Sequence, residues 1–395
     1  MNNINFKNKK ALIRVDFNVP LNKDLSVGDN TRIVAAMPTI KEILNNGGAC
    51  VLMSHLGRPN GERSEKLSLK NIIAEVEKQS GAKVSFIDDC VGDKVKTAVS
   101  ELKTREILLL ENLRFYPGEK KGDLAFAESL AKLGADYYIN DAFGTAHRAH
   151  ASTSVIAQFF EKENRAFGLL MDAEIANAEK VLKSAEKPLT AILGGAKVSD
   201  KIEIINNLMP IADNIIIGGG MAYTFFKAQD GEIGNSLCED DKLDLAKELL
   251  EKAKQNNTNI ILPVDSICAD DFTNNANTSV NASNKVPEGM MGLDIGKQAI
   301  EDFKRVIENS KTILWNGPMG VFEMPAFQQG TKAIALSVAA ATKTGAFSLI
   351  GGGDSVAAIK KFNLEDEVSY VSTGGGAMLE FFEGKTLPGI SSMLS

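Results

Sequence analysis

The sequence has few of the residues that mark disulfide-rich, metal-binding or membrane proteins. Among its 395 residues, only four are cysteines and three are histidines. The cysteines are far apart and form no CxxC pair, which argues against a zinc site or a disulfide framework. No apolar run approaches the roughly 20 residues that span a bilayer, and the first residues, MNNINFKNKK, lack the apolar core of a signal peptide. We therefore expect a cytoplasmic protein that does not bind membranes.

Three familiar catalytic signatures are also absent from the sequence. The chain has no GxxxxGK[ST] loop, no GxGxxG dinucleotide fingerprint and no GxSxG nucleophile elbow. An ordinary P-loop enzyme or dehydrogenase is therefore excluded, and a serine nucleophile is disfavoured. The net charge of −7 is mildly acidic and gives no general attraction to nucleic acid. Any anion-binding site must be local, and we expect no nucleic-acid partner.

Short apolar runs alternate with helical patterns along the whole chain. The run ALIRVDFNV is followed by a predicted helix at 31–46, then by the run ACVLMSH and a predicted helix at 69–80. The second half repeats this rhythm, with helical patterns at 242–254 and 329–341 between runs such as LTAILGG and NIILPVDSI. Uninterrupted apolar strands suit a parallel sheet covered by helices on both faces. With this length, the pattern predicts an α/β fold of two domains.

A predicted helix connects the two halves. Residues 170–182 contain alanines and alternating charges without glycine or proline, which favours one continuous helix over a flexible linker. We expect this helix to act as a semi-rigid hinge between a first domain of residues 1–169 and a second domain of residues 183–381. The last segment, LPGISSMLS, has no strand partner in its own neighbourhood, so its packing does not follow from its residues.

Five segments of the second half place glycines or a lysine where a predicted strand gives way to a helix. They are GGAKVSDK from Gly194, GGGMA from Gly218, WNGPMG from Trp315, GGGDS from Gly351 and TGGGA from Thr373. Glycine lets backbone N–H groups approach an anion closely, and a helix start presents free N–H groups to it. A single such turn has an alternative explanation, because tight connections use glycine for geometry alone. Five of them indicate a phosphate site.

Charged residues beside these turns support this prediction. Lys197 and Lys201 would share one face of the first helical turns, near the positive end of the helix, although a solvated surface face is the alternative. Asp354 begins a predicted helix, where its carboxylate could cap the helix or hold a magnesium ion that bridges nucleotide phosphates. Glu323 could accept a hydrogen bond from a ribose hydroxyl. These side chains would suit a nucleotide.

The histidines lie in the first half beside arginines, in SHLGRP and DAFGTAHRAHAS. Both segments follow predicted strands, so they should lie at the carboxyl ends of the sheet, where open α/β sheets bind ligands. Arg32 opens a predicted helix, Arg114 follows a strand, and Asp16 with Asn18 follows another. Together they would form a basic pocket for a phosphate or carboxylate, unless each arginine makes a separate surface ion pair. A metal site at the paired histidines would lack a further His or Cys ligand nearby.

Taken in order, these motifs closely resemble those of phosphoglycerate kinases over essentially the whole chain. The matching segments are RVDFNVP, SHLGRP, ENLRF, DAFGTAHRAHAS, GGAKVSDK, WNGPMGVFE, GGGDS and GGGAMLEFFEGKTLPG. The resemblance implies two Rossmann-like domains with parallel sheets joined by a helical hinge, and a C-terminal segment at about 382–395 that returns to the first domain. The sequence departs from the family pattern at Lys297, where proline is usual, and in PEGMMG, which lacks the usual tryptophan.

The resemblance also implies a reaction and its site residues. The protein would be a monomer that transfers a phosphoryl group reversibly from 1,3-bisphosphoglycerate to MgADP, giving 3-phosphoglycerate and MgATP in glycolysis and gluconeogenesis. The implied catalytic residues are Arg32, Lys197, Gly352 and Gly375. The implied phosphoglycerate contacts are Asp16, Phe17, Asn18, Arg32, His55, Leu56, Gly57, Arg58, Arg114 and Arg148. The implied nucleotide contacts are Lys197, Lys201, Gly219, Gly292, Asn316, Glu323, Gly351, Gly352, Gly353, Asp354 and Ser355, with Asp354 holding the Mg²⁺ of the nucleotide.

Two other functions are compatible with parts of this pattern. A non-catalytic sensor of a sugar phosphate and a nucleotide would keep the glycines and the basic pocket, but it would not need Arg32 and Lys197 to face one point. A kinase for a simple carboxylate or carbamate would not need a cluster of histidine and arginines for a second phosphate. The expected reaction needs no general base, because its two nucleophiles, a carboxylate and a diphosphate oxygen, are ionised at neutral pH.

Overall fold

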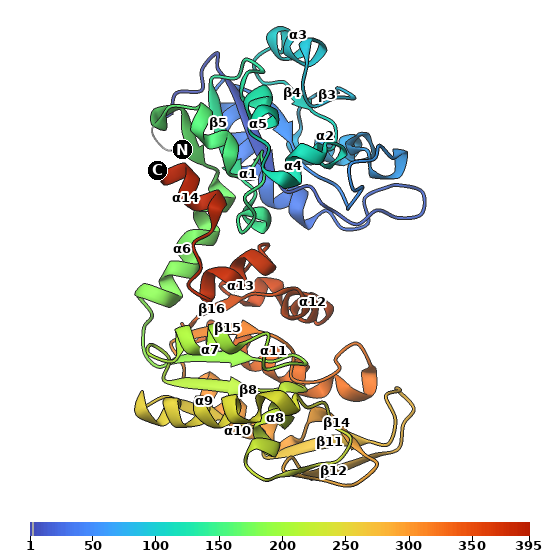
Figure 1. The fold of residues 1–395 in the computed structure, drawn as a ribbon, viewed down its shortest axis with the longest axis vertical. Helices are drawn as coiled ribbons and strands as arrows, with labels where there is room; N and C mark the ends of the chain where they lie inside the picture. Colours follow the sequence, from blue (N-terminus) through green and yellow to red (C-terminus); the bar gives the residue numbers. More distant parts are fainter. Residues whose placement is uncertain (2–3) are drawn as a thin grey trace. The chain divides into compact units, whose positions relative to one another are not determined.

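The computed structural model of the chain describes Met1 and residues 4–395, which form two compact units. Unit 1 comprises Met1–Ile175 and Thr386–Ser395, and unit 2 comprises Ala176–Lys385. Each unit has a central parallel sheet that is flanked by helices (Figure 1). Within the described part of the chain, no helix is both long and apolar enough to cross a membrane.

Unit 1 is built on a parallel sheet with the strand order β3-β4-β2-β1-β5-β6. Its strands are β1 (Lys10–Val15), β2 (Ala49–Met53), β3 (Val84–Phe86), β4 (Ile107–Leu109), β5 (Tyr137–Asp141) and β6 (Arg165–Phe167). Its α-helices are α1 (Thr31–Asn45), α2 (Ile73–Ser80), α3 (Asp93–Glu101), α4 (Pro117–Lys121), α5 (Leu124–Ala131) and α14 (Pro388–Leu394). Its 3₁₀ helices are η1 (Glu65–Leu67), η2 (Leu69–Ile72), η3 (Leu113–Phe115), η4 (Phe143–Thr145), η5 (Val155–Phe159) and η6 (Lys162–Asn164).

Successive residues of β1 pack on opposite faces of this sheet. Ile13 lies in one apolar core with Ile33 of α1 and Val76 of α2. Leu12 lies in a second core with Val99 of α3 and residues of α5. Because both faces are covered, the strand is apolar at nearly every position, which is why it reads as a continuous apolar run in the sequence.

The C-terminal helix α14, drawn in dark red in Figure 1, packs against unit 1. Met393 is buried in the second core of that unit. The side-chain amide of Asn140 donates to the carbonyl of Gly389 at 3.1 Å, and Lys162 Nζ donates to the carbonyl of Leu394 at 3.0 Å. The segment without an evident partner in the sequence is therefore part of the unit that holds β1.

Unit 2 contains a parallel sheet with the order β10-β8-β7-β15-β16-β17, an antiparallel sheet with the order β12-β11-β14, and the pair β13-β9. The strands are β7 (Leu189–Leu193), β8 (Asn214–Ile217), β9 (Glu232–Ile233), β10 (Asn259–Ile261), β11 (Asp265–Ala269), β12 (Thr278–Ala282), β13 (Lys285–Val286), β14 (Met291–Ile295), β15 (Thr312–Asn316), β16 (Phe347–Ile350) and β17 (Tyr370–Val371). The α-helices are α7 (Ile202–Leu208), α8 (Met221–Ala228), α9 (Leu243–Gln255), α10 (Lys297–Glu308), α11 (Gln329–Lys343), α12 (Gly353–Lys361) and α13 (Gly376–Phe382). The 3₁₀ helices are η7 (Asp240–Lys242), η8 (Pro325–Phe327) and η9 (Glu365–Glu367).

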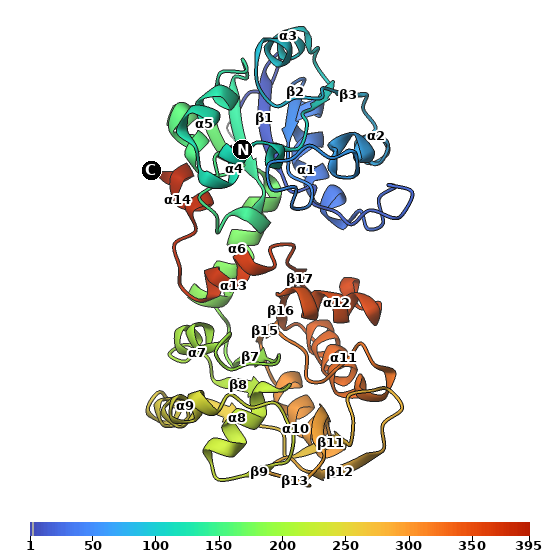
Figure 2. The ribbon, with the colours of Figure 1, turned by 45° about the vertical axis from the view of Figure 1, so that its right-hand side comes forward.

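The single tryptophan of the chain lies in the core of unit 2. Trp315 of β15 is fully buried and packs in one apolar cluster with Phe303 of α10, Ile334 of α11 and Ile359 of α12. Figure 2 shows α11 and α12 beside β16 and β17. This packing fixes the ends of β15 and β16, from which two of the glycine-containing turns begin.

The region at 170–182 forms α6 (Leu169–Lys183), which begins in unit 1 and continues into unit 2 from Ala176. Unit 1 anchors its first turn, because the N–H of Leu169 donates to Thr39 Oγ1 at 2.8 Å and that of Met171 to Asp141 Oδ1 at 3.1 Å. Burial raises the pKa of the Asp141 carboxyl to about 6. The first turn of α6 thus has the side-chain acceptors that a helix start requires.

Three sequence predictions were wrong in detail. NIILPVDSI forms two strands of different sheets, β10 and β11, because Pro263 lacks the N–H needed to continue a ladder. The WNGPMG segment leads into a loop, and α11 begins only at Gln329. In GGAKVSDK, Lys197 and Lys201 precede α7 rather than lying on it. The reason is a contact with a distant part of the chain, since the N–H and hydroxyl of Ser199 bond to the carboxylate of Glu239 and thereby hold the segment in a turn.

Candidate substrate and nucleotide sites

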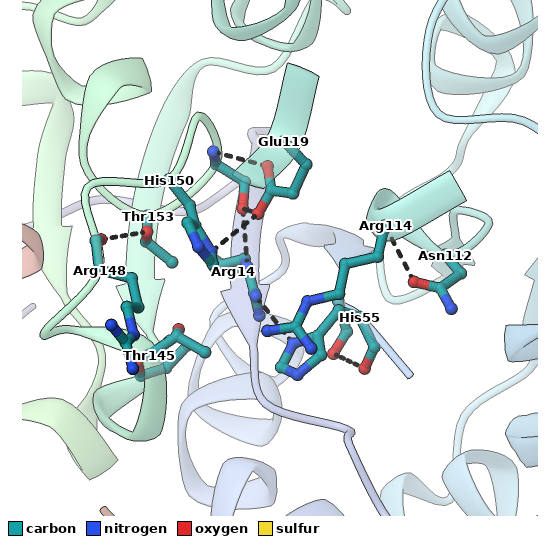
Figure 3. Close-up of polar contacts among 12 residues, drawn as sticks. Arg14, His55, Asn112, Arg114, Glu119, Thr145, Arg148, His150 and Thr153 are labelled. Atoms are coloured by element: carbon teal, nitrogen blue, oxygen red, sulfur yellow. Dashed lines mark hydrogen bonds and ion pairs between the residues drawn. The ribbon is translucent and has the colours of Figure 1, made fainter. Parts of the chain in front are cut away.

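The candidate site of unit 1 lies where β1, β2, β4 and β5 end. Its central side chain is Arg14 of β1, which is fully buried. Arg14 Nε donates to Ser152 Oγ at 2.8 Å, and its Nη2 lies 3.1 Å from His55 Nδ1. In Figure 3, Arg14 and Arg114 both point their guanidinium groups toward His55. The structure therefore places a buried cation beneath the residues that the sequence had grouped.

Arg14 and its partner Glu119 were missed by the sequence reasoning. Glu119 is fully buried and accepts from the N–H of Ser152 at 3.0 Å and from its hydroxyl at 2.6 Å. The acid thus balances Arg14 through Ser152. Buried charges need such a partner. The available signal was an arginine inside the apolar run ALIRV, a position where a cation is otherwise costly.

The two histidines of this site are held neutral. Burial, reinforced by Arg14, Arg114 and Arg32, lowers the pKa of His55 well below its ordinary value. Burial, together with Arg14, Arg114 and Arg148, lowers the pKa of His150 to about 4. A neutral imidazole can both donate and accept a hydrogen bond. The positive charge of the pocket therefore comes from the arginines.

Arg32 faces the loop that follows β1. Its Nη1 lies 3.2 Å from Asp16 Oδ2 and donates to the carbonyl of Asn18 at 3.0 Å. Asn18 Oδ1 in turn accepts from the N–H of Gly57 at 2.8 Å, which ties the loops after β1 and β2 together. The N–H of Phe17 donates to Ser54 Oγ at 2.8 Å. Arg32 is thus oriented by two oxygens of one loop.

The loop after β4 is oriented by a buried asparagine. Asn112 is fully buried, and its side chain accepts from the N–H groups of Leu56 and Arg114 at 3.2 and 3.0 Å. Arg114 Nη1 donates to the carbonyl of Gly57 at 2.8 Å, whereas its Nε is buried and has no hydrogen-bond partner among the described residues. That donor is available to an anion. Arg58 and Arg148, by contrast, have exposed side chains.

Unit 2 contains two adjoining cavities at the carboxyl ends of β7, β8, β15 and β16. One, of about 550 Å³, has mainly apolar walls. The other, of about 370 Å³, is lined by polar groups and backbone. Both include Gly195, Ala196 and Asp354 in their walls, so they form one continuous depression. This combination suits a ligand with an apolar part and a charged part.

The apolar cavity contains the predicted residues Gly219, Gly292 and Glu323. Glycine is required at 292, because a Cβ there would overlap the hydroxyl of Tyr223. Tyr223 was not predicted from the sequence; its hydroxyl donates to Ser266 Oγ at 2.7 Å, which fixes the ring in the cavity wall. The apolar walls of this cavity suit a flat ring system. Glu323 also lines the cavity, and its side chain is exposed.

The polar cavity gathers most of the predicted phosphate contacts. Lys201 donates to Asn316 Oδ1, and burial lowers the pKa of the Lys201 ammonium. Asn316 is itself buried, and its Nδ2 has no hydrogen-bond partner among the described residues. Gly352, with a φ of 86°, precedes the first turn of α12, whose free N–H groups face an anion well. The predicted residues that line this cavity are Lys197, Lys201, Asn316, Gly352, Gly353, Asp354, Ser355 and Gly375.

Gly351 does not belong with these residues. It is buried below them, lines neither cavity, and its N–H donates to the carbonyl of Trp315 at 2.9 Å. Ser355 is fully buried and its hydroxyl accepts from the N–H of Gly317 at 2.5 Å, so it supports the wall. Lys197 and Asp354 have exposed side chains. Among the described residues, no three His, Cys, Asp or Glu side chains gather closely enough to form a metal site.

Asp294 is a further residue that the sequence reasoning missed. It lines the apolar cavity, is buried, and accepts from the N–H of Ile295 at 2.9 Å and that of Gly330 at 2.8 Å. Burial raises the pKa of its carboxyl to about 7. Asp294 joins β14 to the start of α11, and nothing in the local residue pattern distinguishes it from a surface acid.

Comparison with known proteins identifies the family. The family model described as phosphoglycerate kinase matches residues 1–385. The phosphoglycerate kinase of Porphyromonas gingivalis is 50% identical over 98% of each chain, and that of Thermosipho africanus is 51% identical over 99% of this chain and 96% of the relative. The solved structure of phosphoglycerate kinase from Coxiella burnetii covers 100% of this chain and 98% of that one, with 39% identity and a TM-score of 0.89. The chain therefore belongs to the phosphoglycerate kinase family.

Proposed function

We propose that this protein catalyses the reversible transfer of a phosphoryl group from 1,3-bisphosphoglycerate to MgADP, giving 3-phosphoglycerate and MgATP. Family membership over the whole chain carries this proposal. The pair of sites agrees with it, because one holds several arginines and the other has an apolar and a polar part. The relatives do not support a non-catalytic sensor. In keeping with the family, we propose a cytoplasmic monomer that acts in glycolysis and gluconeogenesis.

Unit 1 would bind phosphoglycerate. Asp16 and Asn18, with the neighbouring Phe17, would hold the glycerate part, since they lie on the loop that Arg32 contacts. The unpartnered Nε of Arg114 supports a role in binding the phosphate that is not transferred. The proposed contacts of that phosphate are His55, Arg58, Arg114 and Arg148, and the buried Arg14 would add positive charge from below. Leu56 and Gly57, between His55 and Arg58, are proposed as further substrate contacts.

Unit 2 would bind the nucleotide. Its base would occupy the apolar cavity beside Gly219 and Gly292, and its ribose would lie near Glu323. The phosphates would lie in the polar cavity against Lys201, Asn316, and the N–H groups at the start of α12, with Gly351 and Ser355 as supports.

Asp354 fits a magnesium ion that arrives with the nucleotide. Its exposed carboxylate borders both cavities at the start of α12, and Mg²⁺ is commonly held by one or two carboxylates together with substrate phosphates. The absence of a cluster of three metal-binding side chains among the described residues agrees with such sharing. When bound, the ion would neutralise charge on the phosphate oxygens.

The residues of this chain would act through position and charge. Both nucleophiles are already ionised, so the neutral His55 and His150 are not needed as bases. Arg32 from unit 1 and Lys197 from unit 2 would neutralise the charge on the three transferring oxygens, and the N–H groups near Gly352 and Gly375 would donate to them.

Phosphoryl transfer requires the reacting atoms to approach within about 3 to 3.5 Å. Since the proposed ligands bind to different units, we propose that transfer takes place when the units close, with α6 as the hinge. Closure would also exclude water that could hydrolyse the acyl phosphate. We propose residues 1–169 with 382–395 as the phosphoglycerate domain, and residues 183–381 as the nucleotide domain.

The test is MgATP-dependent formation of an acyl phosphate from 3-phosphoglycerate, trapped with hydroxylamine. The parent protein should form the hydroxamate, and Lys197→Ala should form it at least about 100-fold more slowly, as expected for the loss of a transition-state contact. Acetate and carbamate in place of 3-phosphoglycerate test the other acyl phosphate kinases. A folded parent that binds both ligands but forms no product would favour the sensor.

A further inference from the structure

The segment that carries Lys197 is held by one carboxylate from a distant part of the chain. Glu239 accepts from the N–H of Ser199 at 2.9 Å through Oε2 and from its hydroxyl at 2.5 Å through Oε1. Partial burial raises the pKa of the Glu239 carboxyl, but hydrogen bonds from Ser199 and from the backbone of Val198 outweigh this effect and leave the pKa lower than usual. Glu239 is therefore ionised and binds the two residues that directly follow Lys197.

The hydrogen bonds to Glu239 hold this segment in place of helical backbone hydrogen bonds. The GGAKVSDK segment is a turn in which the N–H of Lys201 donates to the carbonyl of Val198 at 2.9 Å, and α7 begins only at Ile202. A helix would fix the direction of Lys197 through its own backbone hydrogen bonds. In this turn the direction depends instead on the neighbours of Lys197, of which Ser199 bonds through both its backbone and its side chain.

Glu239 is itself fixed from the other side. Its N–H donates to Thr224 Oγ1 at 3.1 Å, and Thr224 is a buried residue of α8. The residues just before it belong to the apolar cavity, since Leu237 lines that cavity and Ser236 Oγ accepts from the N–H of Gly292 at 2.9 Å. One segment, residues 235–239, thus contacts both the apolar cavity and the Lys197 turn.

We propose that Glu239 is a positioning residue that directs Lys197 toward the transferred phosphoryl group. It also connects the Lys197 turn to the wall of the apolar cavity. The inference rests on the proposed function, in which Lys197 contacts that group. Glu239 does not line the polar cavity, so it acts through Ser199 rather than on the substrate.

Removal of the carboxylate should slow catalysis without preventing nucleotide binding. In Glu239→Ala, the N–H and hydroxyl of Ser199 would turn to water and Lys197 would lose its fixed direction. A misplacement of about 1 Å can cost up to about 100-fold in rate, so we expect kcat to fall about 10- to 100-fold. The KM values for MgATP and 3-phosphoglycerate should change less than about 3-fold, because the cavity walls at Ser236 and Leu237 are retained. Glu239→Gln, which keeps one acceptor oxygen, should recover part of the rate.

A double-mutant cycle separates positioning from general damage. We would measure kcat with 3-phosphoglycerate and MgATP for the parent, Glu239→Ala, Lys197→Ala and the double variant. If Glu239 acts through Lys197, the second substitution should change the rate of Lys197→Ala less than about 3-fold, since coupled residues are not additive. If Glu239→Ala slowed the reaction only by reducing the amount of folded protein, the effects of the two substitutions would multiply. That result would overturn the proposal.

Asp241→Ala is the matched control. It removes one negative charge two residues from Glu239, but Asp241 pairs with the adjacent Lys242 on the surface. This variant should keep the parental kcat. Hydrogen exchange gives an independent measurement, because Glu239→Ala should speed exchange in 195–201 and leave 142–153 of unit 1 unchanged. Unchanged exchange in 195–201 would also overturn the proposal. A parent without phosphoglycerate kinase activity would reject the proposed function, whereas an active parent with multiplicative effects would reject this inference alone.

Discussion

Arg32 is the side chain of unit 1 that we propose to contact the transferred phosphoryl group. Its guanidinium is half-buried, and its Nη1 contacts Asp16 and the carbonyl of Asn18. We expect Arg32→Ala to lower kcat by about 100- to 1,000-fold, the range found when one donor to a developing charge is removed. The Kd for MgADP, measured by calorimetry, should change little, because the proposed nucleotide site is in unit 2.

Arg32→Lys controls for the loss of positive charge beside Asp16. Lysine keeps the charge but loses the planar fork that can bind two oxygens at once, so its kcat should lie between those of the parent and Arg32→Ala. Asp16 is nearly buried and would lack a cation in the alanine variant, so circular dichroism should accompany the kinetics. An unchanged kcat in Arg32→Ala would remove Arg32 from the chemistry.

His150 makes the stability of unit 1 depend on pH. Its pKa is about 4 in the folded protein, below the value of about 6.5 expected for an unfolded chain. Between these values the unfolded state binds more protons, so this contribution to stability is present above pH 6.5 and is lost as the pH falls toward 4. From pH 7 to pH 5, the parent should lose about 1 kcal/mol more than His150→Gln, after allowance for partial solvent screening.

Urea titrations followed by circular dichroism at both pH values would measure this difference. Other groups that titrate in this range, such as Asp141 with its raised pKa, are common to both proteins and cancel in the comparison. Equal losses in the parent and the variant would show that His150 is not held neutral. Fluorescence is less suitable, because the single tryptophan, Trp315, lies in unit 2.

At the scale of elements, α10 offers a test of helix capping away from the proposed site contacts. Asp265 of β11 accepts from the N–H groups of Gln298 and Ala299 at 3.1 and 2.7 Å, which satisfies two donors of the first turn. Asp265→Ala should lower the free energy of unfolding of unit 2 by about 1 kcal/mol and leave kcat unchanged. Glu301→Ala, on the exposed side of the same helix, should stay within about 0.5 kcal/mol of the parent. Equal stability of the two variants in urea titrations would contradict the capping role.

The helices and strands also show which patterns in the sequence were sufficient to predict secondary structure. Helices such as α1 and α11 could be predicted to within two residues, because their apolar positions recur with the helical period. The antiparallel sheet of β11, β12 and β14 could not, since β12 has exposed and half-buried residues in alternation and little apolar content. The turn at Lys197 was predicted as helix because its stabilising partner, Glu239, is 40 residues away. Local patterns do not contain such contacts.

At the scale of the whole molecule, the sequence assigned one candidate site to each half, but it did not reveal the buried groups beneath each site. His55 and Lys201 lie within the family motifs SHLGRP and GGAKVSDK, so the residues around them in the sequence were enough to mark them as candidates. Glu119 and Asp294 become informative only when the fold buries them beside Ser152 and Gly330, respectively. A buried acid differs from a surface acid by its environment, and that environment is assembled from distant segments.

The proposed division of the two sites between the units leads to a prediction for the molecule in solution. If phosphoryl transfer requires closure about α6, the radius of gyration should be smaller with 3-phosphoglycerate and a non-hydrolysable MgATP analogue together than with either ligand alone. Small-angle scattering would measure this, with calorimetry to show that both ligands are bound. Arg114→Ala is the control, because it should weaken phosphoglycerate binding in unit 1 and prevent the additional compaction while MgATP binding in unit 2 persists. A parent that binds both ligands without compaction would show that the reacting groups meet without closure, and the hinge role proposed for α6 would then have to be abandoned.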